Sequence, residues 1–198
     1  AVQLLHNRFD IQKPLVPVST WAGVDVILTA SPNAPFSTLK EMIAWAKANP
    51  GKLNYGSVGA GTIEHLLTAN LVRKYGLDAT HVPFKGGPDF MIALTRDDIH
   101  VVATVIPLVN QFKNRVRPMA VMSEKRTPLF PEVPTLMEAG IEVPNFRFWN
   151  GLAAAAGTSP AVVETLQRAI DQALKSEATQ AKYAEMGMIP GATTSTQF

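Results

Sequence analysis

Residues 54–65 have the sequence NYGSVGAGTIEH. A β-rich run is followed by a glycine-rich turn and then by the start of an amphipathic helical segment. The run that ends at Ser57 is bounded by turn residues and predicts a strand. Thr62 is a residue type that begins helices, so a helix is predicted to follow the turn. Strand, glycine turn and helix in this order are typical of an α/β fold.

The same alternation extends along the chain and predicts an α/β architecture with a largely parallel sheet. The first predicted helix has a capping-box pair, Thr38 and Glu41, and stops before Pro50. Strands are predicted at 24–29, 53–57, 80–82, 99–104, 118–122 and 151–155. Helices are predicted at about 39–49, 62–75, 88–94, 107–112, 135–139, 160–175 and 178–186.

Two extended segments, near residues 21–30 and 143–151, predict that the chain crosses twice between two lobes. Residues 28–143 contain enough strands and helices for a complete α/β domain. Residues 1–27 are predicted to be part of the first lobe with a crossing strand, and residues 144–198 a second crossing strand with the returning part of that lobe. Because one strand cannot form a sheet, the first lobe is expected to be partial.

Composition excludes several classes of function. The 18 basic and 16 acidic residues are interleaved and give a net charge of +2, so no basic surface for nucleic acid is predicted. No apolar run approaches the roughly 20 residues of a membrane-spanning helix. The chain has no cysteine, and its 4 histidines lack the spacing of metal ligands, so neither thiolate chemistry nor a metal site is expected.

The glycine turn is a candidate anion site. Glycines let a ligand approach the backbone, and the first amides of a helix favour negative charge, so the amides from Val58 to Thr62 and the hydroxyls of Ser57 and Thr62 could hold a carboxylate. A plain tight turn with Thr62 as the helix cap explains the same residues. A nucleotide cofactor is not expected, because the turn lacks the lysine of a phosphate-binding loop and has Glu64 in place of the third glycine of a dinucleotide fingerprint.

A second glycine-rich segment, 81–88, has the sequence HVPFKGGP. Lys85 there could complement an acidic ligand, or could be an ordinary solvated lysine. An enzyme that handles acyl or phosphoryl groups through Ser57 or Thr62 is the alternative function. It is less favoured, because His65 lies about one helical turn beyond the glycines and is predicted to point away from the Ser57 hydroxyl, which leaves the nucleophile without a base.

Several segments, taken together and in order, resemble the solute-binding proteins of tripartite tricarboxylate transporters, the Bug or TctC type. No single segment would suffice for this resemblance. The matching segments are PGKLNYGSVGAGT (50–62) with His65 and Leu66, HVPFKGG (81–87), RPMAVMS (117–123) with Lys125 and Arg126, PEVPT (131–135) with EAG (138–140), and WNGL (149–152) with AGT (156–158).

The resemblance implies a periplasmic binding protein-like fold of type II, with a ligand held between two lobes and passed to the membrane permease subunits of a transporter. The protein is then expected to be a periplasmic receptor for a small carboxylate-containing metabolite and not an enzyme. At the strand end before Pro107, where relatives often carry an acidic residue, this chain has Thr104. The predicted ligand-binding residues are Ser57, Val58, Gly59, Ala60, Gly61, Thr62, His65, Lys85 and Thr104.

Family members begin with a strand and a Pro-Gly-Gly stretch upstream of the segment that matches residues 9–19, and they continue past Phe198. The chain is therefore expected to be truncated at both ends, with its second lobe complete and its first lobe partial. Two consequences are expected. The first is weak ligand binding, and the second is either residual flexibility of residues 151–155 and 160–175 or self-association that buries their apolar faces against a second molecule.

Overall fold

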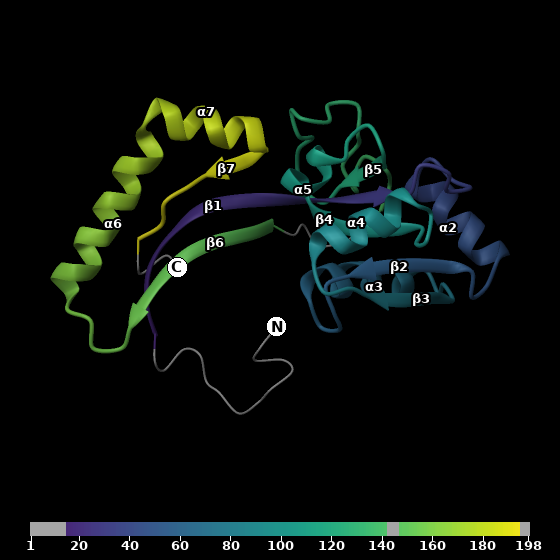
Figure 1. Ribbon diagram of the computed structural model, residues 1–198, viewed down its shortest axis with the longest axis horizontal. Coiled ribbons are helices and arrows are strands. Elements are labelled where there is room, and N and C mark those ends of the chain that lie inside the picture. The colour runs from purple at the N-terminus through teal and green to yellow at the C-terminus, as the bar shows by residue number, and fades with distance from the viewer. Residues whose placement is uncertain (1–14, 142–146, 195–198) are drawn as a thin grey trace. The chain divides into compact units, whose positions relative to one another are not determined.

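The computed structural model describes residues 15–141 and 147–194. The chain divides into two compact units: unit 1 comprises residues 1–24 and 147–198, and unit 2 comprises residues 25–146. Unit 2 contains the end of β1 (Leu15–Ala30) from residue 25 onward, then α2 (Leu39–Ala48), β2 (Leu53–Ser57), α3 (Ile63–Lys74), β3 (Ala79–Pro83), α4 (Gly87–Thr95), β4 (Val101–Val105), α5 (Ile106–Gln111) and β5 (Arg117–Val121), as Figure 1 shows.

The sheet of unit 2 has the strand order β3-β2-β4-β1-β5. β2 is parallel to both β3 and β4, whereas β1 is antiparallel to β4 and to β5. The predicted α/β class is confirmed, and four of the five strands run in the same direction, as expected of a largely parallel sheet; the exception is the long strand β1, which runs against both of its neighbours. A strand that is buried on both faces has the same apolar pattern in either direction, so the sequence could not show this.

Helices cover both faces of this sheet. The chain moves outward from β2 to β3 and then back past β2 to β4, and right-handed crossovers therefore place α3 and α4 on opposite faces. On the face of α4, Val102 joins a buried apolar cluster that includes Phe90 and Ile106. Its neighbours Val101 and Ala103 are also buried and, by the alternation of a strand, point to the other face.

The local helix signals of unit 2 are confirmed where they are strong. Thr38 and Glu41 form the predicted capping box at the start of α2. The helix predicted at 135–139 is wrong: Thr135 forms an isolated bridge with Val121, and residues 136–140 form turns. Gly140, with φ of +74°, ends the segment after a single turn.

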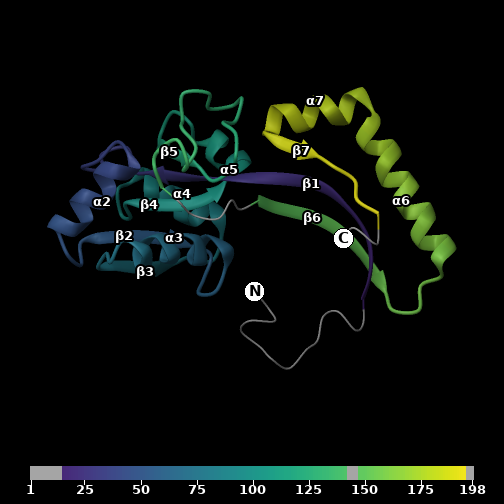
Figure 2. The ribbon, with the colours of Figure 1, turned by 180° about the vertical axis from the view of Figure 1, so that it is seen from behind.

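Unit 1 contains residues 15–24 of β1, together with β6 (Arg147–Ala155), α6 (Pro160–Lys175), α7 (Glu177–Met186) and β7 (Met188–Pro190). β6 and β7 both pair with β1, and α7 lies beside β7 in both ribbon views (Figures 1 and 2). The expectation of a single strand after residue 148 is therefore wrong. The sequence did not predict β7, because three residues that end in proline give little strand signal.

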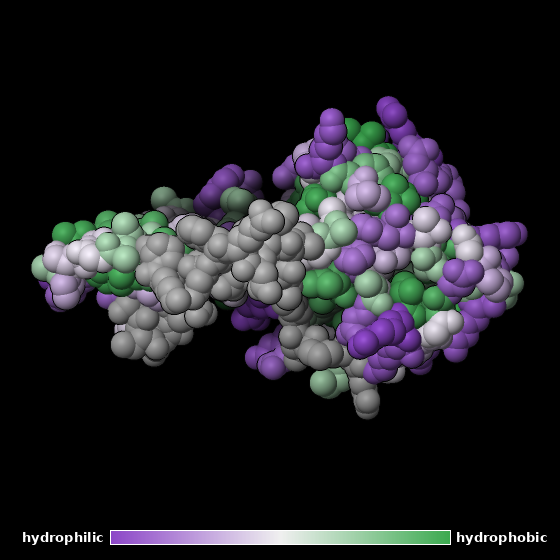
Figure 3. Space-filling model, turned by 90° about the horizontal axis from the view of Figure 1, so that it is seen from below, coloured by the Kyte–Doolittle hydropathy of each residue, from purple (hydrophilic) through white to green (hydrophobic). Residues whose placement is uncertain are grey.

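No helix within the two described stretches has the length and hydropathy needed to cross a membrane. On the face of unit 2 shown in Figure 3, hydrophilic side chains predominate and apolar ones form small separate patches.

Candidate functional site

The turn between β2 and α3 forms the centre of the candidate site. β2 ends at Ser57, which is completely buried, and α3 begins after Thr62. Gly59 and Gly61 have φ of +131° and +77°, conformations that other residues rarely adopt, so the two glycines make this turn possible. Thr62 does not cap α3 with its side chain, and its Oγ1 donates to the carbonyl of Gly59 at 2.8 Å instead.

Several amides of the turn are already used within it. The amide of Gly59 donates to Ser57 Oγ (3.1 Å), that of Gly61 to His65 Nδ1 (3.2 Å), and that of Thr62 to the carbonyl of Gly59 (3.3 Å). The sequence suggests that all the amides from Val58 to Thr62 donate hydrogen bonds to a ligand. In this conformation they cannot all do so, because three of them are bonded within the turn. The first hydrogen bond of α3 runs from Leu66 to Thr62, so the amides of residues 63–65 precede it and form the positive end of the helix.

A cluster of aromatic rings supports the turn from one face of the sheet. His81 Nε2 lies 2.7 Å from Ser57 Oγ. The ring centroids of His65 and His81 are 4.2 Å apart, and the ring of Tyr55 stacks on both histidines. Burial lowers the pKa of His81, and nearby His65 lowers it further; burial raises the pKa of Tyr55. Both shifts favour the neutral forms of these two side chains near neutral pH.

Sequence reasoning missed the roles of His81 and Tyr55: it considered only His65 as a base for Ser57, whereas the histidine beside the Ser57 hydroxyl is His81. The signal lies in strand pairing: β2 and β3 are parallel with Tyr55 opposite His81, and Ser57 is two residues along on the same face as Tyr55. His65 makes no hydrogen bond to Ser57, as expected, but it lies over His81. His81 therefore contacts the Ser57 hydroxyl, and Tyr55 and His65 pack against His81.

The two remaining predicted site residues are placed differently. The exposed Lys85 follows the end of β3, where the amide of Phe84 donates to the carbonyl of Ser57 at 2.8 Å and joins the two strand ends. Thr104, in β4, is buried and pairs with Ile27 of β1. Lys85 therefore offers a positive charge at the end of the sheet that carries the turn, whereas Thr104 packs inside the sheet.

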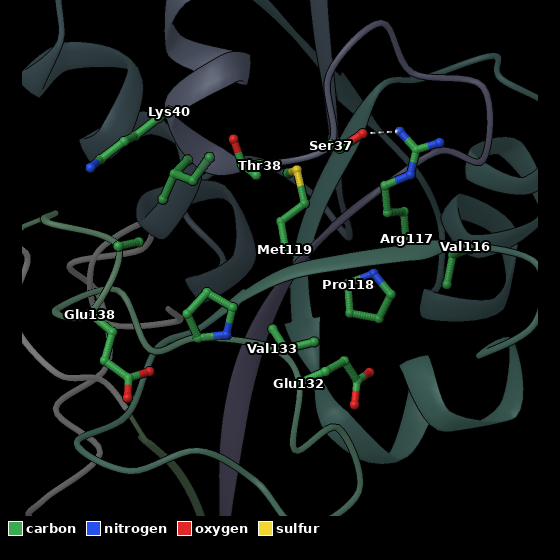
Figure 4. Close-up of a pocket in the computed structure, with 13 residues that line it drawn as sticks. Ser37, Thr38, Lys40, Val116, Arg117, Pro118, Met119, Glu132, Val133 and Glu138 are labelled. Atoms are coloured by element: carbon green, nitrogen blue, oxygen red, sulfur yellow. Dashed lines mark hydrogen bonds between the residues drawn. The ribbon is translucent and has the colours of Figure 1, made fainter.

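A pocket of about 580 Å³ lies at the opposite end of this sheet (Figure 4). Ala30 pairs with the first residues of both β4 and β5, whereas Ser57 is the last residue of β2. Two charged groups in the lining are already bonded: Arg117 donates to carbonyls of the segment 32–36, and Glu138 accepts from Arg126. The lining residues are Ser37, Thr38, Leu39, Lys40, Val116, Arg117, Pro118, Met119, Glu132, Val133, Pro134, Glu138 and Ala139.

Comparison with known proteins gives the family of the chain. The family described as "Tripartite tricarboxylate transporter family receptor" (TctC) matches residues 5–198. The chain belongs to this family. The resemblance found in the sequence is thereby confirmed. The UPF0065 protein in the gbd 5' region of Cupriavidus necator is 36% identical over 194 residues, which are 96% of this chain and 58% of that protein.

Solved structures agree with the TctC assignment and confirm the mixed α/β fold of solute-binding proteins. A protein of R. palustris with adipate has a TM-score of 0.89 at 27% identity, over 96% of this chain and 64% of the other. MatC from Rhodopseudomonas palustris with bound malate has a TM-score of 0.81 at 25% identity, over 88% and 60%. The periplasmic binding protein BugD gives 0.81 at 25% identity, over 89% and 60%. The chain thus spans less than two thirds of these three structures and about 58% of the C. necator relative.

Proposed function

We propose that this TctC-family protein is a periplasmic receptor, and not an enzyme, that captures a small carboxylate-containing metabolite at the β2–α3 turn and delivers it to membrane permease subunits. One observation carries the proposal: the glycine turn leads into the N-terminus of α3 in a chain whose structural neighbours hold adipate and malate. Both of those ligands are dicarboxylates, and a helix N-terminus favours negative charge.

The proposed contacts follow from the bonds within the turn. The amides of Val58 and Ala60 and those of residues 63–65 are the proposed donors to a carboxylate, because Gly59, Gly61 and Thr62 use their amides internally. Lys85 would add a positive charge beside the turn. Thr104 would shape the interior behind it, and Ser57 and His65 would support the turn.

The affinity expected of these contacts is low. The end of one helix contributes about 0.3–2 kcal/mol toward an anion, whereas a dissociation constant of 1 μM requires about 8 kcal/mol. Unit 2 supplies one such helix end at the turn. We therefore expect this chain to bind dicarboxylates with dissociation constants in the millimolar range or weaker.

An NMR titration of the ¹⁵N-labelled chain with adipate and malate tests the proposal. The amide signals of residues 58–65 should move in a saturable way. The Lys85→Gln variant should bind about two- to fivefold more weakly at low salt, the effect of one exposed charge, whereas Lys52→Gln, which removes another exposed lysine, should not change the affinity. Absence of saturable shifts at the turn with either ligand would refute the proposed site.

The Ser57–His81 contact is the one observation that favours an acyl- or phosphoryl-transferring enzyme, since a histidine beside a serine hydroxyl can act as its base. Two facts oppose this function: Ser57 is completely buried, and its hydroxyl donates its one proton to the carbonyl of Gly59, which makes His81 a donor to Ser57 in this arrangement rather than its base. Turnover of an activated ester or a nucleotide that is abolished by Ser57→Ala would establish the enzyme and overturn the receptor proposal.

A further inference from the structure

Two histidines bond directly to the turn that forms the proposed ligand site. His81 Nε2 lies 2.7 Å from Ser57 Oγ, and His65 Nδ1 accepts the amide of Gly61 at 3.2 Å. Ser57 Oγ in turn bonds to both the amide and the carbonyl of Gly59, at 3.1 and 3.0 Å. The two glycines with positive φ are therefore each connected to a histidine ring.

We propose that His81 and His65 are positioning residues, His81 holding the turn through Ser57 and Gly59, and His65 holding it through the amide of Gly61. The inference rests on the proposed function in one respect, because the turn is the proposed ligand site. Neither histidine needs to touch the ligand. Their role is to keep the turn in the conformation in which the amides that are not bonded within it can donate to a ligand.

These contacts determine which nitrogen of each histidine carries a proton. Because the Gly61 amide donates to His65 Nδ1, this nitrogen carries no proton in the observed arrangement. A hydroxyl has one proton, so when Ser57 donates to the carbonyl of Gly59, the proton between Ser57 and His81 belongs to His81 Nε2. His65 therefore acts as an acceptor in the turn, and His81 as a donor.

Few other ionisable groups lie on the neighbouring elements. Tyr55 of β2 stacks on both rings, Glu64 precedes His65 in α3, Lys85 follows β3, and β4 has no ionisable residue. The rings of His65 and His81 are too close for two positive charges to form easily. This repulsion adds to burial in lowering the pKa of His81.

Paired variants of the full chain test the positioning roles. His65→Leu and His81→Leu remove the bonding nitrogen, while His65→Asn retains an acceptor near Nδ1 and His81→Gln retains a donor near Nε2. The leucine variants should shift the ¹⁵N–¹H signals of Gly59 and Gly61 and speed their hydrogen exchange by about tenfold or more. The asparagine and glutamine variants should restore signals close to those of the wild type.

His100 provides a matched control in the same unit. Its Nδ1 accepts the amide of Asn54 at 3.1 Å, and its ring packs near Trp45 and Phe36. The His100→Leu variant loses a similar bond outside the turn, so it should leave the signals of Gly59 and Gly61 in place. Equal effects of His100→Leu and the two turn variants on these signals would overturn the proposal.

The same samples, titrated with adipate, separate this inference from the proposed function. Each leucine variant should bind adipate about tenfold more weakly than the wild type, and each polar variant within about twofold of it. Unchanged turn signals, or changed signals with unchanged affinity, would overturn the positioning roles. A wild type that binds neither adipate nor malate would overturn the proposed function instead, and the turn signals of the free protein would still decide the positioning roles.

The polar variants cover the case in which a leucine variant does not fold. His65→Asn and His81→Gln should keep the Gly59 and Gly61 amide signals and exchange rates close to those of the wild type. Turn signals that differ strongly from the wild type in a folded polar variant would count against the positioning role of that histidine.

Discussion

The carboxylate of Glu138 connects Arg126 and Thr135, two residues of the irregular segment after β5. Its Oε2 accepts from Arg126 Nε and from the amide of Thr135, both at 2.8 Å, and the Glu138 amide donates to Thr135 Oγ1 at 3.2 Å. The hydrogen bond from Arg126, followed by that from Thr135, lowers the pKa of Glu138 below its ordinary value of 4.5. The ionised carboxylate is therefore the form that this segment stabilises.

This geometry predicts a pH-dependent contribution to stability. Since the pKa of Glu138 is lower in the folded state than in the unfolded state, its contribution is fully present above about pH 4.5 and is lost as the pH falls through the folded pKa. Glu138→Gln should lower the free energy of unfolding at neutral pH, and its difference from the wild type should shrink with acidification in urea titrations. Glu132→Gln, which removes a nearby exposed carboxylate, is the matched control.

At the scale of secondary-structure elements, β2 contains a glycine, Gly56, at a position where the packing leaves no room for a side chain. A Cβ atom at Gly56 would lie 2.6 Å from Ile99 Cδ1, 3.2 Å from Val102 Cγ1 and 3.3 Å from Phe84 Cε2. These atoms belong to packed apolar side chains, so one added methyl group requires several of them to move. The glycine therefore allows the sheet and its covering side chains to pack closely just before the turn.

Gly56→Ala is expected to destabilise the chain by about 1–3 kcal/mol, the usual cost of overpacking a core. Gly191→Ala is the matched control, because no atom lies within 4 Å of its Cβ position and its φ is not positive. Chemical denaturation should show a lower midpoint for Gly56→Ala and little change for Gly191→Ala. Similar midpoints for Gly56→Ala and the wild type would mean that Ile99 and its neighbours yield easily.

Elements were predictable where their signals are local. Thr38 and Glu41 are three residues apart and form the predicted capping box, and the glycine turn lies between a strand and a helix as expected. What depends on distant pairing was not predictable. The direction of β1, the short strand β7 and the position of His81 beside Ser57 all depend on partners 24 or more residues away.

At the scale of the whole molecule, the core of unit 2 is formed by residues of that unit. Its buried apolar cluster runs from Ile27 to Val133 in sequence and contains side chains of β1, β4 and β5, of α4 and α5, and of the loops between and after them. Unit 1 differs in the burial of its helices. α6 has buried side chains at Val163 and Leu174, and α7 has none.

Unit 1 also has large apolar side chains at its surface. Val162 on α6 is 49% exposed, Leu15 on β1 is 40% exposed, and Ile189 on β7 is 37% exposed. Burying a valine side chain contributes about 1.5 kcal/mol of favourable free energy. Contact with a second molecule that covers these residues would therefore stabilise the association. The self-association expected from the sequence therefore stays a prediction, with Val162 as its most exposed site on α6.

Sedimentation velocity over a wide range of concentration tests this prediction. The wild-type chain should form dimers or larger species as its concentration rises, and Val162→Lys should weaken the association about tenfold, because it replaces an apolar contact with a charge. Glu164→Lys is the matched control, because it introduces the same side chain at an exposed position on the same helix without removing apolar surface. This variant should associate about as strongly as the wild type, with any small difference due to the changed charge. A wild type that stays monomeric throughout would mean that the apolar residues of unit 1 tolerate water, and equal effects of the two lysine variants would assign any association to charge rather than to Val162.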